Sequence, residues 1–164
     1  MYPTPMPPAR ALVITTEVLL GVLFLVGVAA ILLLPSLAGE LAVSYPEYAD
    51  LRVPLLATAT VFTLLGLFAI VVVALLVRRI GIGAMLSRGS VRWVDLLGAA
   101  LGCAAALVVV GFVVVSNGQA GSPFMALIQV LTCLALISLA CVTRVLRSLL
   151  QNAIAMRAEL DEVV

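Results

Sequence analysis

The amino-acid composition and the length of the apolar segments predict an all-α integral membrane protein. Hydrophobic residues make up 65% of the 164 residues and charged residues only 10%, with a mean hydropathy of +1.32. Soluble domains carry roughly 25% charged residues. Four apolar segments reach the roughly 20 residues that a helix needs to cross a bilayer, and they are too long for barrel strands. We therefore predict a four-transmembrane-helix bundle.

The first two predicted helices are bounded by prolines. The first covers residues 11–34, in which Glu17 is the only charged residue, and we expect it to end at Pro35, a helix breaker. The second covers residues 54–77 without a charge and begins at Pro54, a residue that suits the first helical position. A pair of arginines follows the second segment and marks its exit from the membrane.

The last two predicted helices cover residues 93–115 and about 123–147, joined by a turn rich in Gly, Asn and Pro. These helices complete a transmembrane domain of residues 11–150. Residues 1–10 are rich in proline and are expected to form a disordered arm. A signal peptide is the alternative for the first segment, but its apolar run is longer than a signal requires and its N-terminal flank is weakly basic, so we expect helix one to be retained.

The distribution of arginines predicts the orientation, since the chain has no lysine. The linker between helices two and three, residues 78–92, holds four arginines and no acid. The linker between helices one and two, residues 35–53, holds three acids and one arginine. Because positive residues remain in the cytoplasm, we expect the basic linker and both termini to be cytoplasmic.

Charged residues near the cytoplasmic ends of three helices form a candidate inner-leaflet cluster. Glu17 lies about two turns into its helix, where an ionised carboxylate needs a partner or a proton. We expect the cluster to act as a structural clamp; a proton or substrate relay is the alternative, although the outer halves of the helices carry no charge to continue a path. Its members are Glu17, Asp95, Arg144 and Arg147.

Helix three carries two further features. Arg92 and Trp93 lie where it enters the membrane and are expected to anchor it at the interface. Gly98 and Gly102 form a G-x-x-x-G pair, a pattern that favours close helix packing. The pattern leaves open whether the contact lies within one chain, in a homodimer or in a larger membrane complex.

Residue types that carry chemistry are scarce, and we expect no enzyme. The chain has no histidine, and its three cysteines lie inside predicted helices without metal-ligand spacing. Glu47 and Asp50 in the acidic linker are a poor candidate pair for a metal ion. We therefore predict no catalytic residue, no cofactor and no metal site.

The C-terminal stretch, residues 148–164, predicts a helical cytoplasmic tail with one apolar face. Apolar residues recur there at close to 3.5-residue spacing, so helix four is expected to continue as an amphipathic extension. This face either docks on the basic linker or the membrane surface, or it binds a cytosolic partner. The candidate partner-binding residues are Leu149, Ala153, Met156, Arg157, Leu160 and Asp161.

Three stretches of the chain resemble a bacterial membrane family, domain-of-unknown-function family 2975, in its actinobacterial branch. The stretches are YPEYADLRVP, LSRGSVRWVDLLGAA and LLQNAIAMRAELDEVV, with RWVD and RAELDEV the most specific pieces. The resemblance implies a four-helix protein of the bacterial cytoplasmic membrane without an assigned activity. It also implies a helix-turn-helix regulator as a candidate partner and lends no catalytic residues.

Two classes of function follow. The first is a non-enzymatic membrane anchor or sensor that binds a cytosolic partner such as a helix-turn-helix regulator. The alternative is a small transporter or an auxiliary subunit of a larger transport complex. We prefer the first because charge and amphipathic character concentrate at the cytoplasmic ends of the helices. The lipid bilayer is the remaining expected partner. We expect no direct binding of nucleic acid.

Overall fold

Four long α-helices and one short 3-10 helix make up the computed structural model, which describes residues 8–81, 88–119 and 121–162. The helices are α1 (Pro8–Ser44), α2 (Arg52–Gly81), α3 (Arg88–Asn117) and α4 (Pro123–Glu162), and η1 (Pro46–Leu51) joins α1 to α2. All four long helices are long and apolar enough to cross a membrane, as expected of a multi-pass membrane protein.

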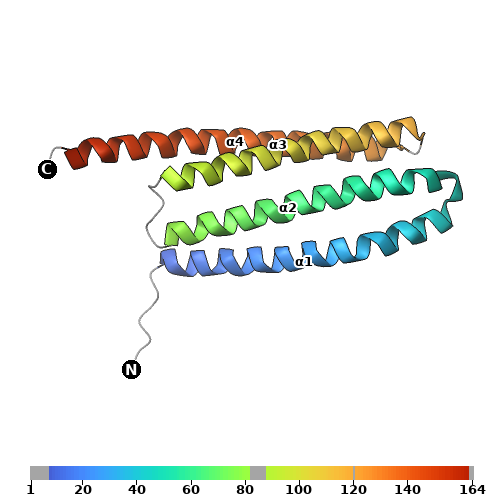
Figure 1. Ribbon diagram of the computed structural model, residues 1–164, viewed down its shortest axis with the longest axis horizontal. Coiled ribbons are helices and arrows are strands. Elements are labelled where there is room, and N and C mark those ends of the chain that lie inside the picture. The colour runs from blue at the N-terminus through green and yellow to red at the C-terminus, as the bar shows by residue number, and fades with distance from the viewer. Residues whose placement is uncertain (1–7, 82–87, 120, 163–164) are drawn as a thin grey trace, which may run out of the picture.

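The helices pack in the order in which they occur along the chain, as Figure 1 shows. α1 packs on α2, α2 on α3, and α3 on α4, so α2 and α3 are the interior helices and α1 and α4 lie at the edges. The expected bundle is therefore an open row in the part of the chain that the structure describes. A closed bundle would also pack α1 extensively against α4.

The helices are longer than the apolar segments that predict them. α1 begins at Pro8, inside the stretch expected to be a disordered arm, and α4 continues to Glu162 without a break. Helix ends depend on backbone hydrogen bonds and propensity rather than on hydropathy, and arginine is a good helix former. At 1.5 Å per residue, α4 is about 60 Å long, twice the roughly 30 Å of a bilayer core.

The end of the first helix is the clearest difference from the expected fold. α1 passes through Pro35 and ends at Ser44, ten residues beyond the expected end at residue 34. Proline removes one backbone hydrogen bond, but a membrane helix tolerates the loss where nearby hydroxyl groups satisfy freed carbonyls. The carbonyl that loses its donor at Pro35 is that of Ile31, while the hydroxyl of Ser36 donates to the carbonyl oxygen of Leu33 in the same turn at 2.8 Å. α1 bends toward α2 over its later turns (Figure 1).

The acidic linker is largely helical. Its acidic residues lie in the last turns of α1 and in η1, while Arg52 is the first residue of α2. One guanidinium nitrogen of Arg52 lies 3.5 Å from the position that a Cβ on Gly39 would occupy. The side chain at the start of α2 therefore contacts the last turns of α1. Leu51 lies so close to Gly118, in the turn after α3, that a side chain at Gly118 would collide with it. We call this end of the molecule the acidic end.

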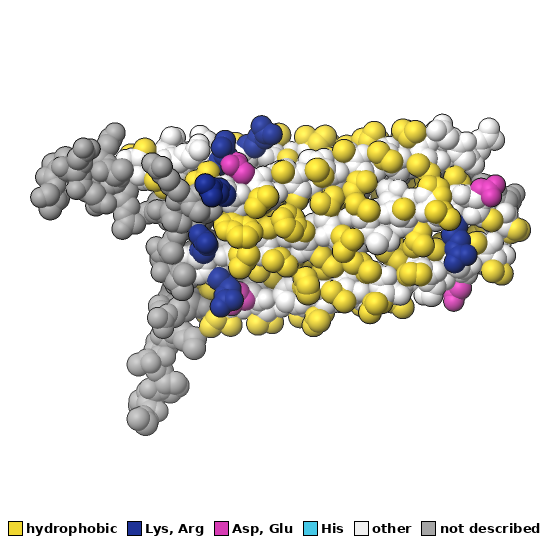
Figure 2. All heavy atoms as spheres, in the orientation of Figure 1, with side chains coloured by type: hydrophobic (Ala, Val, Ile, Leu, Met, Phe, Trp, Pro, Cys, Tyr) yellow, Lys and Arg dark blue, Asp and Glu magenta, His cyan; other side chains and the backbone are white. Residues whose placement is uncertain are grey.

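The opposite end carries most of the arginines, and we call it the basic end. Figure 2 shows an apolar surface between two ends that bear the charges. The main buried cluster lies toward the basic end, where Val72 and Leu76 of α2 meet Val94 of α3 and Leu150 of α4. Most other large apolar side chains are exposed, as expected for helices covered by hydrocarbon.

Candidate functional site

Two ion pairs lie at the basic end, each between neighbouring helices. The first joins Glu17 of α1 to Arg78 of α2, with 3.9 Å between Oε1 and Nε. The second joins Asp95 of α3 to Arg147 of α4, with 2.5 Å between Oδ1 and Nε. The first is a loose contact, whereas in the second the two charged groups lie directly against each other.

The structure thus divides the expected four-residue cluster. Glu17 pairs with Arg78, which was not among the expected members, and Arg144 forms no ion pair within the described part of the chain. The cause is the order of packing, since α2 and α3 lie between α1 and α4. The depth of a charge along its helix can be read from sequence, but its neighbouring helix cannot.

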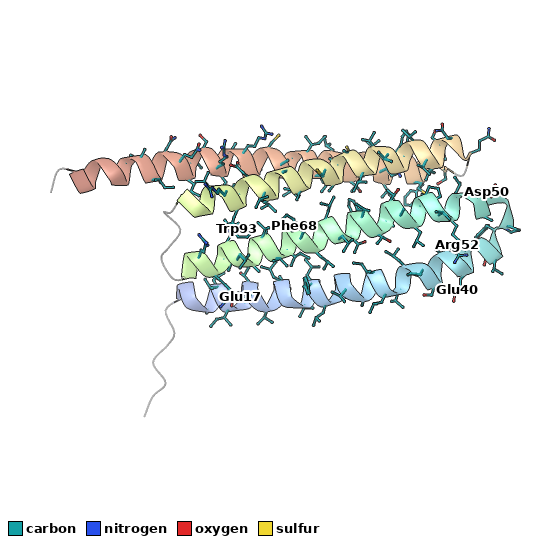
Figure 3. All side chains as sticks on the ribbon, viewed as in Figure 1. Glu17, Glu40, Asp50, Arg52, Phe68 and Trp93 are labelled. Atoms are coloured by element: carbon teal, nitrogen blue, oxygen red, sulfur yellow. The ribbon has the colours of Figure 1, made fainter. Side chains whose placement is uncertain are left out.

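Trp93 and Arg92 have different surroundings. Arg92 is exposed, while Trp93 is half-buried and packs against the buried cluster at the basic end, near Val94. Figure 3 labels Trp93 on the same end of the molecule as Glu17. The tryptophan therefore contributes to packing between helices as well as lying where an interfacial residue is expected.

The two glycines of the G-x-x-x-G pair also differ. A Cβ at Gly98 would lie 3.8 Å from Cγ2 of Thr143, so this glycine faces α4. Thr143 is buried and its hydroxyl donates to the carbonyl oxygen of Leu139 at 2.7 Å. A Cβ at Gly102 would have no atom within 4 Å. The close approach of α3 and α4 thus uses Gly98 and leaves Gly102 on an open face.

In the last turns of α4, adjacent leucines have opposite surroundings. Leu150 is 7% exposed and belongs to the buried cluster, and Ile154 packs against it. Leu149 is 61% exposed and Met156 60% exposed. Of the other expected tail residues, Ala153 is half-buried, and the side chains of Arg157, Leu160 and Asp161 lie outside the described residues.

A set of polar residues that we did not single out from the sequence lies toward the acidic end. Thr58 of α2 and both Gln129 and Thr132 of α4 line a groove of about 240 Å³ that α3 also borders. Each threonine hydroxyl donates to a carbonyl oxygen of its own helix. Gln129 is the only amide side chain in the apolar run of residues 123–142, a signal that could have identified this groove.

Metal-binding and redox groups do not gather in the part of the chain that the structure describes. No group of three His, Cys, Asp or Glu residues lies close enough to hold an ion there. Cys103, Cys133 and Cys141 are free thiols, two of them exposed. The side chain of Glu47 lies outside the described residues, so its expected lack of a metal-binding role stays a prediction.

Comparison with known proteins identifies the family and nothing more specific. No curated protein and no solved structure matches the chain. The model of the family described as protein of unknown function (DUF2975) matches residues 36–164. The match includes the acidic linker, α2, α3 and α4, and it begins directly after Pro35 of α1. Since it covers well over half of the sequence, the chain belongs to the DUF2975 family.

Proposed function

We propose that this protein is a non-enzymatic membrane anchor or sensor that holds a cytosolic partner, such as a helix-turn-helix regulator, on the last turns of α4. The observation that carries the proposal is that one face of these turns is buried in the bundle while another face is exposed. Leu150 is buried against α2 and α3, whereas Leu149 and Met156 present apolar surface that no described residue covers. Exposed apolar residues on one face of a helix are a common docking surface for a protein partner.

The position of this face along the helix supports a partner outside the membrane. α4 continues from Arg147, where it pairs with Asp95, to Glu162. Residues 148–162 extend about 22 Å along the helix axis. Arg144 and Arg147 end the apolar run of α4. Met156 follows Arg147 by nine residues, about 14 Å along the helix axis, so we infer that it lies beyond the hydrocarbon layer, whereas Leu149 lies beside Leu150 at the level of the buried cluster.

The orientation is inferred from charge. Arg78 and Arg147 lie at the basic end in their ion pairs, while Glu40 and Asp50 lie with Arg52 at the acidic end (Figure 3). By the positive-inside rule, the basic end and both termini face the cytoplasm of a bacterial cell. The acidic end is then exposed to the cell envelope, where a sensor would receive its signal.

A pull-down of the tagged, full-length protein from membranes tests this proposal. Truncation of residues 155–164 removes Met156 and the end of the tail while keeping Leu150 and Ile154, which the helix packing needs. A wider deletion from residue 148 would remove the buried Leu150 and disturb the fold. We expect a DNA-binding protein to be recovered with the full chain and lost on truncation. Recovery in equal amounts from both would contradict the proposal.

Point variants refine the test. Leu149→Ala and Met156→Ala remove apolar surface from the proposed docking face, and both are expected to weaken recovery of the partner. Val142→Ala is the matched control, because Val142 is 63% exposed on the same helix but lies within the apolar run. Equal weakening by the control would show that the face beyond Arg147 has no special role.

A transporter or an auxiliary subunit of a transport complex is the second candidate. The groove lined by Thr58, Gln129 and Thr132 favours it, because polar residues within spanning helices are typical of substrate paths. The same pull-down distinguishes the two candidates. Recovery of transport subunits that does not depend on residues 155–164 would favour this alternative.

A further inference from the structure

A groove between α1 and α2 opens to the surface at the basic end. Its volume is about 340 Å³, and the Glu17–Arg78 pair lies at one end of it. The walls below the pair are apolar and reach Phe24 on α1 and Ile70 on α2. From Glu17 to Phe24 the groove extends about 10 Å along the helix. Such dimensions accommodate a segment of an alkyl chain.

Gly21 keeps the groove open. It lies in the wall on α1, and a Cβ built on it would have no atom within 4 Å. Gly27, six residues and about 9 Å further along α1, is different, because a Cβ there would collide with Leu67. The helices are therefore in close contact at Gly27 and separate toward the basic end, where the groove lies.

The mouth of the groove carries one charge of each sign, Arg78 and Glu17. α2 ends with Arg78 and Arg79, and Glu17 is the acid that faces Arg78. The Arg78 side chain is 74% exposed, and its 3.9 Å contact with Glu17 is longer than the roughly 2.7–2.9 Å of a charge-assisted hydrogen bond. Its guanidinium donors are thus accessible to an anion at the level where the apolar run of α2 ends.

We propose that this groove binds one anionic phospholipid, with its phosphate on Arg78 and the upper part of an acyl chain between α1 and α2. The combination of an accessible guanidinium at the interface and an apolar channel directly below it matches the two halves of a lipid. A second copy of the chain would instead require a contact along much of α1, and it would have to cover the charged pair. The site is separate from the tail of α4 and does not depend on the proposed function.

Native mass spectrometry of the full-length protein in detergent tests the site, with phosphatidylglycerol as the anionic probe and phosphatidylcholine as the comparison. We expect one phosphatidylglycerol per chain, bound in preference to phosphatidylcholine. Gly21→Leu fills the groove and is expected to abolish this binding. Gly66→Leu is its control, because Gly66 lies on α2 outside the groove and its Cβ position is also open.

Charge variants separate lipid binding from a purely structural ion pair. Arg78→Gln is expected to weaken phosphatidylglycerol binding about fivefold, the contribution of one basic residue at an anionic surface. Arg144→Gln, at another exposed arginine of the same end, is expected to leave it unchanged. Glu17→Gln is expected to strengthen binding, because it removes a negative charge beside the phosphate. A structural pair would instead make Glu17→Gln and Arg78→Gln equally harmful.

Three results would overturn the proposal. The first is equal binding of the two lipids, and the second is unchanged phosphatidylglycerol binding in Gly21→Leu and Arg78→Gln. The third is conversion of a dimer into a monomer by Gly21→Leu, which would assign the groove to a contact between two copies. Thermal unfolding of each variant in detergent confirms that it is folded before its lipid binding is compared.

Discussion

Asp95 and Glu17 show how the partner of an acidic side chain determines its contribution to stability. Both acids lie on membrane helices near the basic end, and both contact an arginine of the next helix in the row. The contact of Asp95 with Arg147 is short and the contact of Glu17 with Arg78 is long. Only the Asp95–Arg147 pair is a close ion pair, and the attraction between two charges grows as their separation falls.

We predict that Asp95→Asn lowers thermal stability more than Glu17→Gln does. Both members of the Asp95 pair are nearly half-exposed, so its loss is expected to cost only about 0.5–1 kcal/mol. Unfolding of the purified protein in detergent measures the effect. A double-mutant cycle with Arg147→Gln isolates the pairwise part, and a coupling of zero would contradict the prediction.

The residue types of the candidate site could be predicted, but their pairing could not. Glu17, Asp95 and Arg147 stand out because charges are rare in apolar runs. Arg78 was assigned only to the end of α2, since nothing in the chain shows that it faces α1. Trp93 likewise stands out by type, while its contact with the buried cluster depends on how α2, α3 and α4 converge.

Among the helices, α3 shows that a small-residue motif does not identify its own contact face. Gly98 and Gly102 lie one turn apart, yet the first faces Thr143 of α4 and the second faces open space. Four residues correspond to about 400° of helix rotation, so the second glycine is turned about 40° away from the first. Where two helices cross at an angle, this turn is enough to take the second glycine out of contact. The spacing indicates that packing occurs without indicating where it ends.

We predict that Gly98→Leu destabilises the protein and that Gly102→Leu does not. A leucine at position 98 would push α4 away at Thr143, which is expected to cost about 1–3 kcal/mol. A leucine at position 102 would extend into space that lipid fills. Thermal unfolding measures both variants. If Gly102→Leu proved as harmful as Gly98→Leu, the open face would be in contact with a second chain.

The end of α1 shows that a local sequence signal, here Pro35, does not by itself locate a helix boundary. Proline is a strong signal for the end of a helix in water, because the chain can leave the helix there and water hydrates the freed backbone groups. In α1 the helix continues for nine residues beyond it. In hydrocarbon an unpaired backbone costs more than a bend, so the chain keeps its remaining helical hydrogen bonds. Helix propensity measured in water therefore underestimates the length of this helix.

For the molecule as a whole, the separation of a basic end from an acidic end predicts the orientation. Labelling of single cysteines tests it in a variant whose three native cysteines are replaced by alanine. We expect Ser122→Cys, in the turn before α4, to react with a membrane-impermeant maleimide in intact cells. Met156→Cys is expected to react only after lysis. The reverse pattern would refute the orientation and the cytosolic partner together.

The number, type and approximate position of the spanning helices follow from the sequence, because each helix satisfies its own backbone hydrogen bonds in hydrocarbon and needs only about 20 apolar residues to do so. The family, too, can be recognised from short stretches near the helix ends. Pairing of Glu17 with Arg78, the open row of helices and the groove beside Gly21 could not be derived in this way. These features depend on which faces of nearly uniform apolar helices meet, and hydropathy is almost the same on every face of such a helix.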